Sequence, residues 1–144
     1  MVEMPEKLMN LFREWHTFPV ATVGKDGKPN VAGKSGRVQD AETIIWSELY
    51  FMQTYENLKE NPVASICVWE RKPPFRAYKI NGRVELHEDD KLVAQETEIL
   101  RKGHERAGAP VFKPRKEKMA VIVFKVNEIY DQTPSLDAGG RKIS

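Results

Sequence analysis

Phe18-Pro19-Val20-Ala21-Thr22-Val23 has the apolar and β-branched composition of a short β-strand. The residues that follow it, Lys25-Asp26-Gly27-Lys28, predict a tight turn, because an Asp-Gly pair supplies the positive φ that a hairpin needs. Residues 30–38 are then expected to be the return strand. The chain is therefore predicted to begin its sheet with an antiparallel hairpin.

Four further strands are expected along the chain, over residues 44–51, 63–70, 77–87 and 119–126. Gly82 inside the third of these predicts a bulge or a bend. Helices are expected over residues 3–16, 54–61 and 89–106. Asp89 is expected to cap the last of these helices, and the apolar face of this helix is expected to consist of Leu92, Val93, Ile99 and Leu100. A loop is expected over residues 107–118. Because the strands are not regularly interleaved with helices, the pattern predicts a mainly β (α+β) fold, an antiparallel six-stranded barrel with peripheral helices.

Composition narrows the classes of function. With Lys+Arg 23 and Asp+Glu 21, the 144-residue chain carries a net charge of only +2, which argues against a strongly basic nucleic-acid-binding protein. No apolar run is long enough for a transmembrane helix, and the acidic start does not resemble a signal peptide, so a cytoplasmic protein without a membrane partner is expected. The single cysteine, Cys67, excludes an internal disulfide and a zinc ribbon, and its apolar neighbours predict a buried, unreactive thiol.

No group of residues in the sequence has the spacing of a self-sufficient catalytic site. Gly33-Lys34-Ser35 resembles the end of a phosphate-binding loop, but Lys28 stands where that motif has its first glycine, and no helix is expected to follow. The histidines, His16, His87 and His104, lack the spacing of metal ligands, so no metal is expected. Because no catalytic residue is identified, an enzyme with this sequence would depend on a cofactor for its chemistry.

The short helix expected at residues 54–61 is a candidate anion site. Free backbone N–H groups at a helix start bind anions, and the Thr54 hydroxyl would add a donor. The alternative is that Thr54 only caps the helix. Lys34, Arg37 and Lys59 are the candidates to balance the charge of a phosphate.

The ordered set of segments over residues 10–131 resembles the pyridoxamine 5′-phosphate oxidase-like FMN-binding split-barrel family. The resemblance rests on the opening hairpin and on three later segments: Thr54-Tyr55-Glu56-Asn57-Leu58-Lys59-Glu60-Asn61-Pro62, Asn81-Gly82-Arg83-Val84-Glu85 and Val126-Asn127-Glu128-Ile129-Tyr130-Asp131. The polar composition of residues 132–144, with Pro134, Gly139 and Gly140, predicts a tail or arm. The resemblance implies a split-barrel domain over residues 1–131, which includes the N-terminal helix. It also implies a homodimer with two FMN molecules between the subunits.

The same resemblance implies which residues bind FMN. The second strand would lie along the flavin and its ribityl chain, the third strand would add a few neighbours, and the short helix would hold the phosphate with help from Lys34 or Arg37. Because strand side chains alternate between faces, Lys34 and Arg37 should point to opposite sides, unless Gly33 or Gly36 carries a bulge or lets a ring approach the backbone. The implied residues are Val31, Ala32, Gly33, Lys34, Ser35, Arg37, Trp46, Ser47, Glu48, Gln53, Thr54 and Asn57.

Departures from the family pattern argue against the vitamin B6 oxidase reaction. Gln53 stands where members often have Lys or Arg, Ala77 stands where the oxidase has a glutamine, and the C-terminal Arg/His motif is missing. The expected function is that of an FMN-dependent oxidoreductase with a small-molecule substrate or a donor such as NAD(P)H. The alternatives are a non-catalytic carrier of flavin, F420 or haem, and a barrel that binds single-stranded nucleic acid through Trp46, Tyr50, Phe51 and Tyr78.

Overall fold

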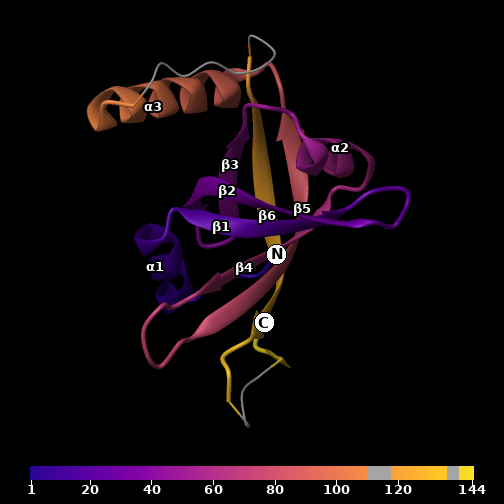
Figure 1. Ribbon diagram of the computed structural model, residues 1–144, viewed down its shortest axis with the longest axis vertical. Helices are drawn as coiled ribbons and strands as arrows, with labels where there is room; N and C mark the ends of the chain where they lie inside the picture. Colours follow the sequence, from indigo (N-terminus) through magenta and orange to yellow (C-terminus); the bar gives the residue numbers. More distant parts are fainter. Residues whose placement is uncertain (110–117, 136–139) are drawn as a thin grey trace.

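A closed antiparallel barrel forms the body of the protein in the computed structural model, which describes residues 1–109, 118–135 and 140–144 (Figure 1). Neighbouring strands follow the order β3-β2-β1-β4-β5-β6, and β6 pairs back with β3 to close the barrel. This confirms the predicted fold class. The six strands are β1 (Thr17–Val23), β2 (Pro29–Asp40), β3 (Thr43–Glu48), β4 (Val63–Trp69), β5 (Ala77–His87) and β6 (Ala120–Asp131).

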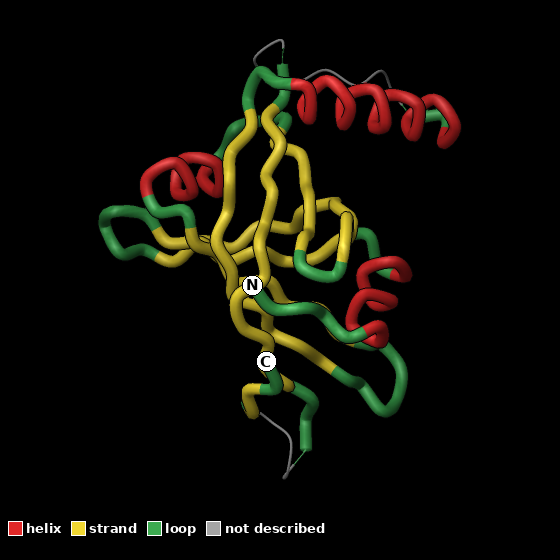
Figure 2. The backbone as a smooth tube through the Cα atoms, turned by 180° about the vertical axis from the view of Figure 1, so that it is seen from behind, coloured by secondary structure: helices red, strands yellow, loops and turns green. Residues whose placement is uncertain are grey.

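Helices α1 (Glu6–Glu14), α2 (Gln53–Glu60) and α3 (Lys91–Ala107) lie outside the barrel, and α3 extends well beyond it (Figure 2). Two predicted caps are wrong by one or two residues. The cap of α3 is Asp90 rather than Asp89, because the Asp90 carboxylate accepts a hydrogen bond from the backbone N–H of Val93 at 3.1 Å. The residue that precedes α2 is Met52, which makes no side-chain cap, and Thr54 lies inside the first turn.

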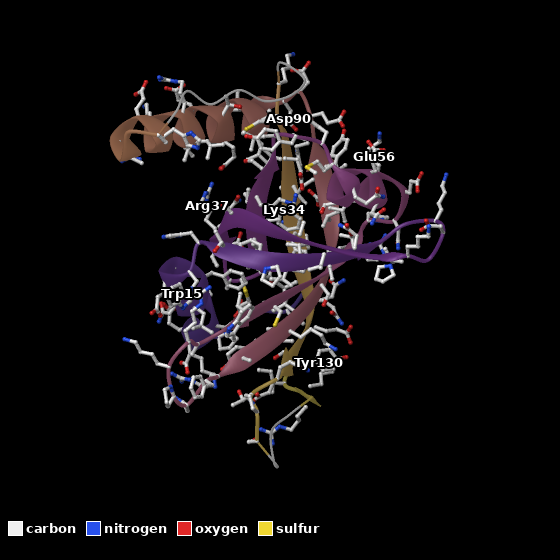
Figure 3. All side chains as sticks on the ribbon, viewed as in Figure 1. Trp15, Lys34, Arg37, Glu56, Asp90 and Tyr130 are labelled. Atoms are coloured by element: carbon white, nitrogen blue, oxygen red, sulfur yellow. The ribbon has the colours of Figure 1, made fainter. Side chains whose placement is uncertain are left out.

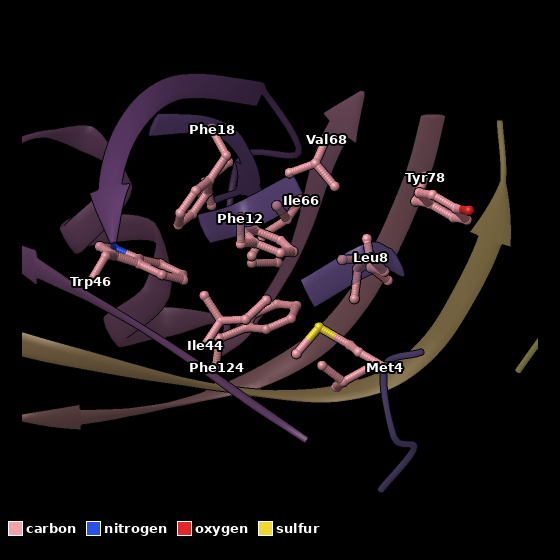
Figure 4. Packing of buried hydrophobic residues seen from close by; sticks show 14 of the residues in the cluster. Met4, Leu8, Phe12, Phe18, Ile44, Trp46, Ile66, Val68, Tyr78 and Phe124 are labelled. Atoms are coloured by element: carbon pink, nitrogen blue, oxygen red, sulfur yellow. The ribbon is translucent and has the colours of Figure 1, made fainter. Parts of the chain in front are cut away.

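A row of aromatic rings fills the barrel interior and reaches α1 (Figure 4). The ring centres of Phe12 and Phe18 are 5.2 Å apart, those of Phe18 and Trp46 6.2 Å, and those of Trp46 and Phe124 6.1 Å. Phe12 belongs to α1, so this helix packs on the barrel through the same core. The first two contacts are edge-on and the third is tilted. Edge-on contacts add about 0.5–1.5 kcal/mol each beyond the burial of the rings.

A second, smaller core lies under α3 on the outer face of the barrel. Ile45, Val121 and Val123 pack there against Val93 of α3. Because strand side chains alternate, Ile45 faces α3, whereas Ile44 and Trp46 on either side of it face the interior. Ile99, which was predicted for the buried face of α3, is half exposed.

Some local details differ from the sequence-based expectation. β3 ends at Glu48 instead of continuing to Phe51, since Phe51 has a positive φ of 53° and the chain turns there toward α2. β6 continues to Asp131 because its second half pairs with β5. A two-residue strand that the sequence did not predict, β7 (Arg141–Lys142), pairs with the end of β6 inside the expected tail, whose residues 136–139 lie outside the described part. Residues 110–117 of the expected loop also lie outside it.

Gly82 and Cys67 test two further predictions. The pairing of β5 and β6 shifts register between Asn81 and Gly82, which confirms the irregularity predicted there. A Cβ atom on Gly82 would lie 2.6 Å from a ring carbon of Phe124, so the site requires glycine. The prediction that Cys67 is buried is wrong, because its side chain is only partly buried; this partial burial raises the pKa of its thiol.

Candidate functional site

The barrel is split where β2 and β3 separate. The two strands pair only between residues 36–40 of β2 and 43–46 of β3, and the last pair is Gly36 with Trp46. Beyond it, β2 pairs with β1 and the end of β3 pairs with β6. A pocket of about 320 Å³ lies at this split. It is lined by Gly33, Lys34, Ser35, Ser47, Glu48, Leu49, Tyr50, Met52, Leu100 and His104.

A buried ion pair connects the two strands at this pocket. The Lys34 ammonium lies 2.9 Å from one carboxylate oxygen of Glu48 and 3.0 Å from the other. The Trp46 indole N–H donates to the same carboxylate at 3.1 Å. The Glu48 side chain is 3% exposed and that of Lys34 is 14% exposed. Glu48 is thus held by two donors, and the pair replaces the backbone hydrogen bonds that are missing between the strands.

Arg37 points to the other side of β2. Its guanidinium pairs with Glu96 of α3 and lines a separate cavity between β2 and α3. Arg37 and Lys34 are both labelled in Figure 3. Lys34, three residues earlier, pairs with Glu48 on the face that also carries Trp46. The expectation that the two cations face opposite sides is therefore confirmed. Each of them already has a carboxylate partner.

The two glycines of β2 have different surroundings. Neither carries a bulge, since the register shift in β2 lies between Val38 and Asp40. A Cβ atom on Gly36 would lie 2.4 Å from the carbonyl oxygen of Ile45 and 2.9 Å from the ring of Phe18. A Cβ atom on Gly33 would meet nothing within 4 Å. Of the two, only Gly33 offers an open backbone surface to a flat ligand.

The polar side chains of α2 serve mainly to attach this helix to the barrel. The Asn57 amide donates to the Thr22 hydroxyl at 3.0 Å, and the Asn30 amide donates to the Thr54 hydroxyl at 3.2 Å. Thr54 and Asn57 are buried, and neither lines the pocket. Gln53 is exposed and donates to the Asn57 side chain at 2.7 Å. The part of α2 that adjoins the pocket is its start, at Met52.

Five of the residues expected to bind FMN line the pocket: Gly33, Lys34, Ser35, Ser47 and Glu48. Val31 is on the outside of β2 with 67% of its surface exposed, and the buried Trp46 reaches the pocket only through Glu48. Leu49, Tyr50, Met52, Leu100 and His104 line the pocket without having been predicted. Leu100 and His104 belong to α3, and no sequence signal places this helix over the split, because its position depends on packing against β3 and β6.

The described residues contain neither a metal-binding cluster nor a membrane-spanning helix. No group of three or more His, Cys, Asp or Glu side chains in this part of the chain is placed to hold a metal ion. None of the helices described has the length and apolar character needed to cross a membrane.

Comparison with known proteins identifies the family. The sequence model described as pyridoxamine 5′-phosphate oxidase matches residues 4–133, which is most of the chain. The chain belongs to the pyridoxamine 5′-phosphate oxidase family. An uncharacterized protein of Methanocaldococcus jannaschii is 27% identical over 142 residues, which cover 96% of this chain and 87% of that protein.

Several solved structures share the fold of this chain. The protein HupZ of Group A Streptococcus superposes with a TM-score of 0.72 at 24% identity, over 96% of this chain and 100% of that one. An F420 reductase is 25% identical with a TM-score of 0.65, over 88% of this chain and 98% of that one. A related FMN-binding protein of Nostoc punctiforme has a TM-score of 0.65 at 14% identity, over 90% and 83% of the two chains. All three structures thus share the fold of this chain.

Proposed function

We propose that this protein binds FMN in the pocket at the split between β2 and β3 and acts as an FMN-dependent oxidoreductase. The observation that carries the proposal is that one pocket joins the open backbone at Gly33, the Lys34–Glu48 pair and the start of α2. When bound, FMN supplies hydride or electron transfer, chemistry that amino-acid side chains do not provide. The names of the F420 reductase and of the Nostoc protein support a redox cofactor of the flavin type.

The lining of the pocket fits a flat polar ring. Gly33 leaves the β2 backbone uncovered, so a ring system can approach it without a steric barrier. Ser35 and Ser47 add hydroxyl groups, and Lys34 adds N–H donors on one wall. Leu49, Tyr50 and Leu100 supply apolar contact. This mixture of apolar surface and a few polar groups is typical of cofactor pockets.

The phosphate would lie at the start of α2. The first backbone N–H groups of a helix are free of intrahelical partners and favour an anion, and Met52 marks this helix start on the pocket wall. Lys34 is the cation nearest in the pocket lining, but its charge is balanced by Glu48. We therefore expect Lys34 to act as a hydrogen-bond donor in the site and to contribute little net positive charge.

A second copy of the chain would complete the site. A volume of about 320 Å³ is near the lower end of the roughly 300–1,000 Å³ usual for ligand pockets. Tyr50 and Met52 at its rim are 57% and 62% exposed, and neighbouring exposed apolar side chains at a pocket rim form a surface suited to contact with a partner. A homodimer that covers these side chains accounts for both features.

Ligand identification tests the proposal. The protein is purified and its visible absorption spectrum is recorded. The bound ligand is then released, and its mass is measured by mass spectrometry. We expect the mass of FMN, at one molecule per chain, and uptake of added FMN by any protein that lacks it. The mass of F420 or of haem would replace FMN as the cofactor, and a protein that takes up no FMN would overturn the proposal.

Turnover distinguishes an oxidoreductase from a carrier. FMN-loaded protein is mixed with NADH or NADPH and an electron acceptor, and consumption of the nicotinamide is followed against free FMN at the same concentration. Faster consumption with the protein supports an oxidoreductase. A rate equal to that of free FMN with each donor and acceptor tried favours the carrier function.

A further inference from the structure

A second cavity, of about 220 Å³, also adjoins Gly33. Its floor is the outer face of three strands. Pro19 of β1 is the register partner of Gly33, and Cys67 of β4 lies beside Pro19 one step beyond the pair formed by Val20 and Ile66. These three residues have short side chains or none, so the floor is low and flat. Gly33 lines both this cavity and the pocket assigned to FMN.

Two tryptophans and an arginine form the sides of the cavity. Trp15 ends α1, and Trp69 ends β4 with 41% of its surface exposed. The guanidinium of Arg71 lies 3.7 Å from the centre of the Trp15 ring. Stacking of this kind holds an arginine side chain in place while its N–H donors remain available.

The charge of Arg71 is not balanced by a carboxylate within the described residues. The acidic residue next to it, Glu70, is fully engaged by Arg76 on the far side of the loop. The Arg76 guanidinium approaches Glu70 at 2.6 and 2.7 Å, and the backbone N–H of Arg76 donates to the same carboxylate at 3.0 Å. Within the described residues Arg71 forms no ion pair, and its guanidinium contacts the Trp15 ring. A stacked guanidinium with free donors beside an aromatic slot is suited to bind a carboxylate.

We propose that this cavity binds a planar aromatic carboxylate. The ring would lie on the flat floor beside Trp15 and Trp69, and the carboxylate would pair with Arg71. A ligand in this position would meet FMN at Gly33, which makes aromatic carboxylates the substrate class of the enzyme. The assignment as substrate rests on the proposed function, whereas the binding of the carboxylate does not.

Isothermal titration calorimetry with 2-naphthoate tests this binding. The full chain is compared with Arg71→Gln and with Lys72→Gln, in which a neighbouring cation that does not line the cavity is removed. A charge-assisted hydrogen bond is worth about 1.5–3 kcal/mol, so we expect Arg71→Gln to weaken binding about tenfold or more. Lys72→Gln should leave it unchanged. The neutral probe 2-naphthamide should bind weakly and equally to all three proteins.

Any of three results would overturn the inference. The unmodified chain could fail to bind 2-naphthoate, Arg71→Gln and Lys72→Gln could lose affinity for it equally, or the unmodified chain could bind the carboxylate and the amide with equal affinity. Thermal unfolding of Arg71→Gln checks that the variant is folded, and only a small loss of melting temperature is expected because the side chain is exposed.

An FMN titration of the same proteins distinguishes this inference from the proposed function. Normal FMN uptake without naphthoate binding rejects only the inference, and naphthoate binding without FMN uptake rejects only the proposed function.

Discussion

Lys34 and Glu48 connect β2 to β3 just beyond the point where the backbones of these strands stop pairing. The Glu48 carboxylate accepts from both Lys34 and the Trp46 indole, so it is tied at once to the neighbouring strand and to the barrel core. An ion pair this deeply buried costs a large desolvation free energy, and it is stable only while both partners remain. The split in the barrel is thus maintained by side chains, and Lys34 and Glu48 also line the pocket proposed for FMN.

The first prediction concerns the stability of this pair. Glu48→Gln leaves the Lys34 ammonium buried without its carboxylate, and we expect a loss of about 3–5 kcal/mol in the free energy of unfolding. Lys34→Gln is expected to cost a similar amount, because it leaves the Glu48 charge unpaired. The double variant Lys34→Gln/Glu48→Gln should lose less than the sum of the single variants. Chemical denaturation of the four proteins measures this, and additive losses would show that the pair is not coupled.

The second prediction contrasts the glycines of β2. Gly36→Ala forces a methyl group against the Ile45 carbonyl and the Phe18 ring, and we expect a cost of about 1–3 kcal/mol or more. Gly33→Ala places the same group in open space and should leave the free energy of unfolding nearly unchanged. Gly33→Val, by contrast, should weaken FMN binding, because its side chain covers the backbone surface proposed to face the ring. Equal melting temperatures for Gly36→Ala and Gly33→Ala would contradict the packing described.

The third prediction concerns the attachment of α3. Arg37 holds Glu96, the buried charged residue of this helix, against the outer face of β2. Arg37→Gln removes the partner of a carboxylate that is only 9% exposed. We therefore expect faster amide hydrogen exchange along α3, with little change in the strands of the barrel interior. Exchange that rises equally in α3 and in the barrel would indicate a general loss of stability instead.

The fourth prediction concerns pH and the start of α3. The hydrogen bond to Asp90, opposed by burial and assisted by Glu85, raises the pKa of His87 above its usual 6.5. The same bond, with the backbone N–H of Val93, lowers the pKa of Asp90 below its usual 3.8. The raised histidine contributes stability below pH 6.5 that is lost as the pH rises through its folded-state pKa, and the lowered aspartate contributes stability above pH 3.8 that is lost on acidification.

His87→Asn therefore should destabilise the protein between these two values and have little effect in alkaline solution. Thermal unfolding of this variant and the unmodified chain at a pH of about 5 and about 9 measures the difference. His16→Asn serves as a control. A stability difference that is the same at both values would show that protonation of His87 does not contribute.

Much of the barrel could be predicted because its signals are local. The Asp-Gly turn and the apolar strands around it fix the first hairpin, and Gly82 marks the irregularity in β5. The alternation of strand side chains also correctly separates Lys34 from Arg37. These features depend on neighbours in sequence, so a single sequence contains them.

The partners of the charged residues could not be predicted in the same way. Glu48 meets Lys34 because β2 and β3 diverge after Gly36, and Glu96 meets Arg37 because α3 packs on Ile45. Both contacts join residues far apart in the chain. For the same reason Leu100 and His104 were not expected at the pocket. Trp46 and Tyr78, which were candidates to stack nucleic-acid bases, are buried in the core and unavailable for that role.

The proposal that FMN binds at the split is tested most directly by an FMN titration of two matched double variants. Lys34→Gln/Glu48→Gln removes the ion pair that lines the pocket, and Arg37→Gln/Glu96→Gln removes the one on the opposite face of β2. We expect the unmodified chain to bind one FMN, the first variant to bind it about tenfold more weakly or worse, and the second to retain its affinity. Loss of affinity in the second variant alone, or no FMN binding by the unmodified chain, would contradict the account.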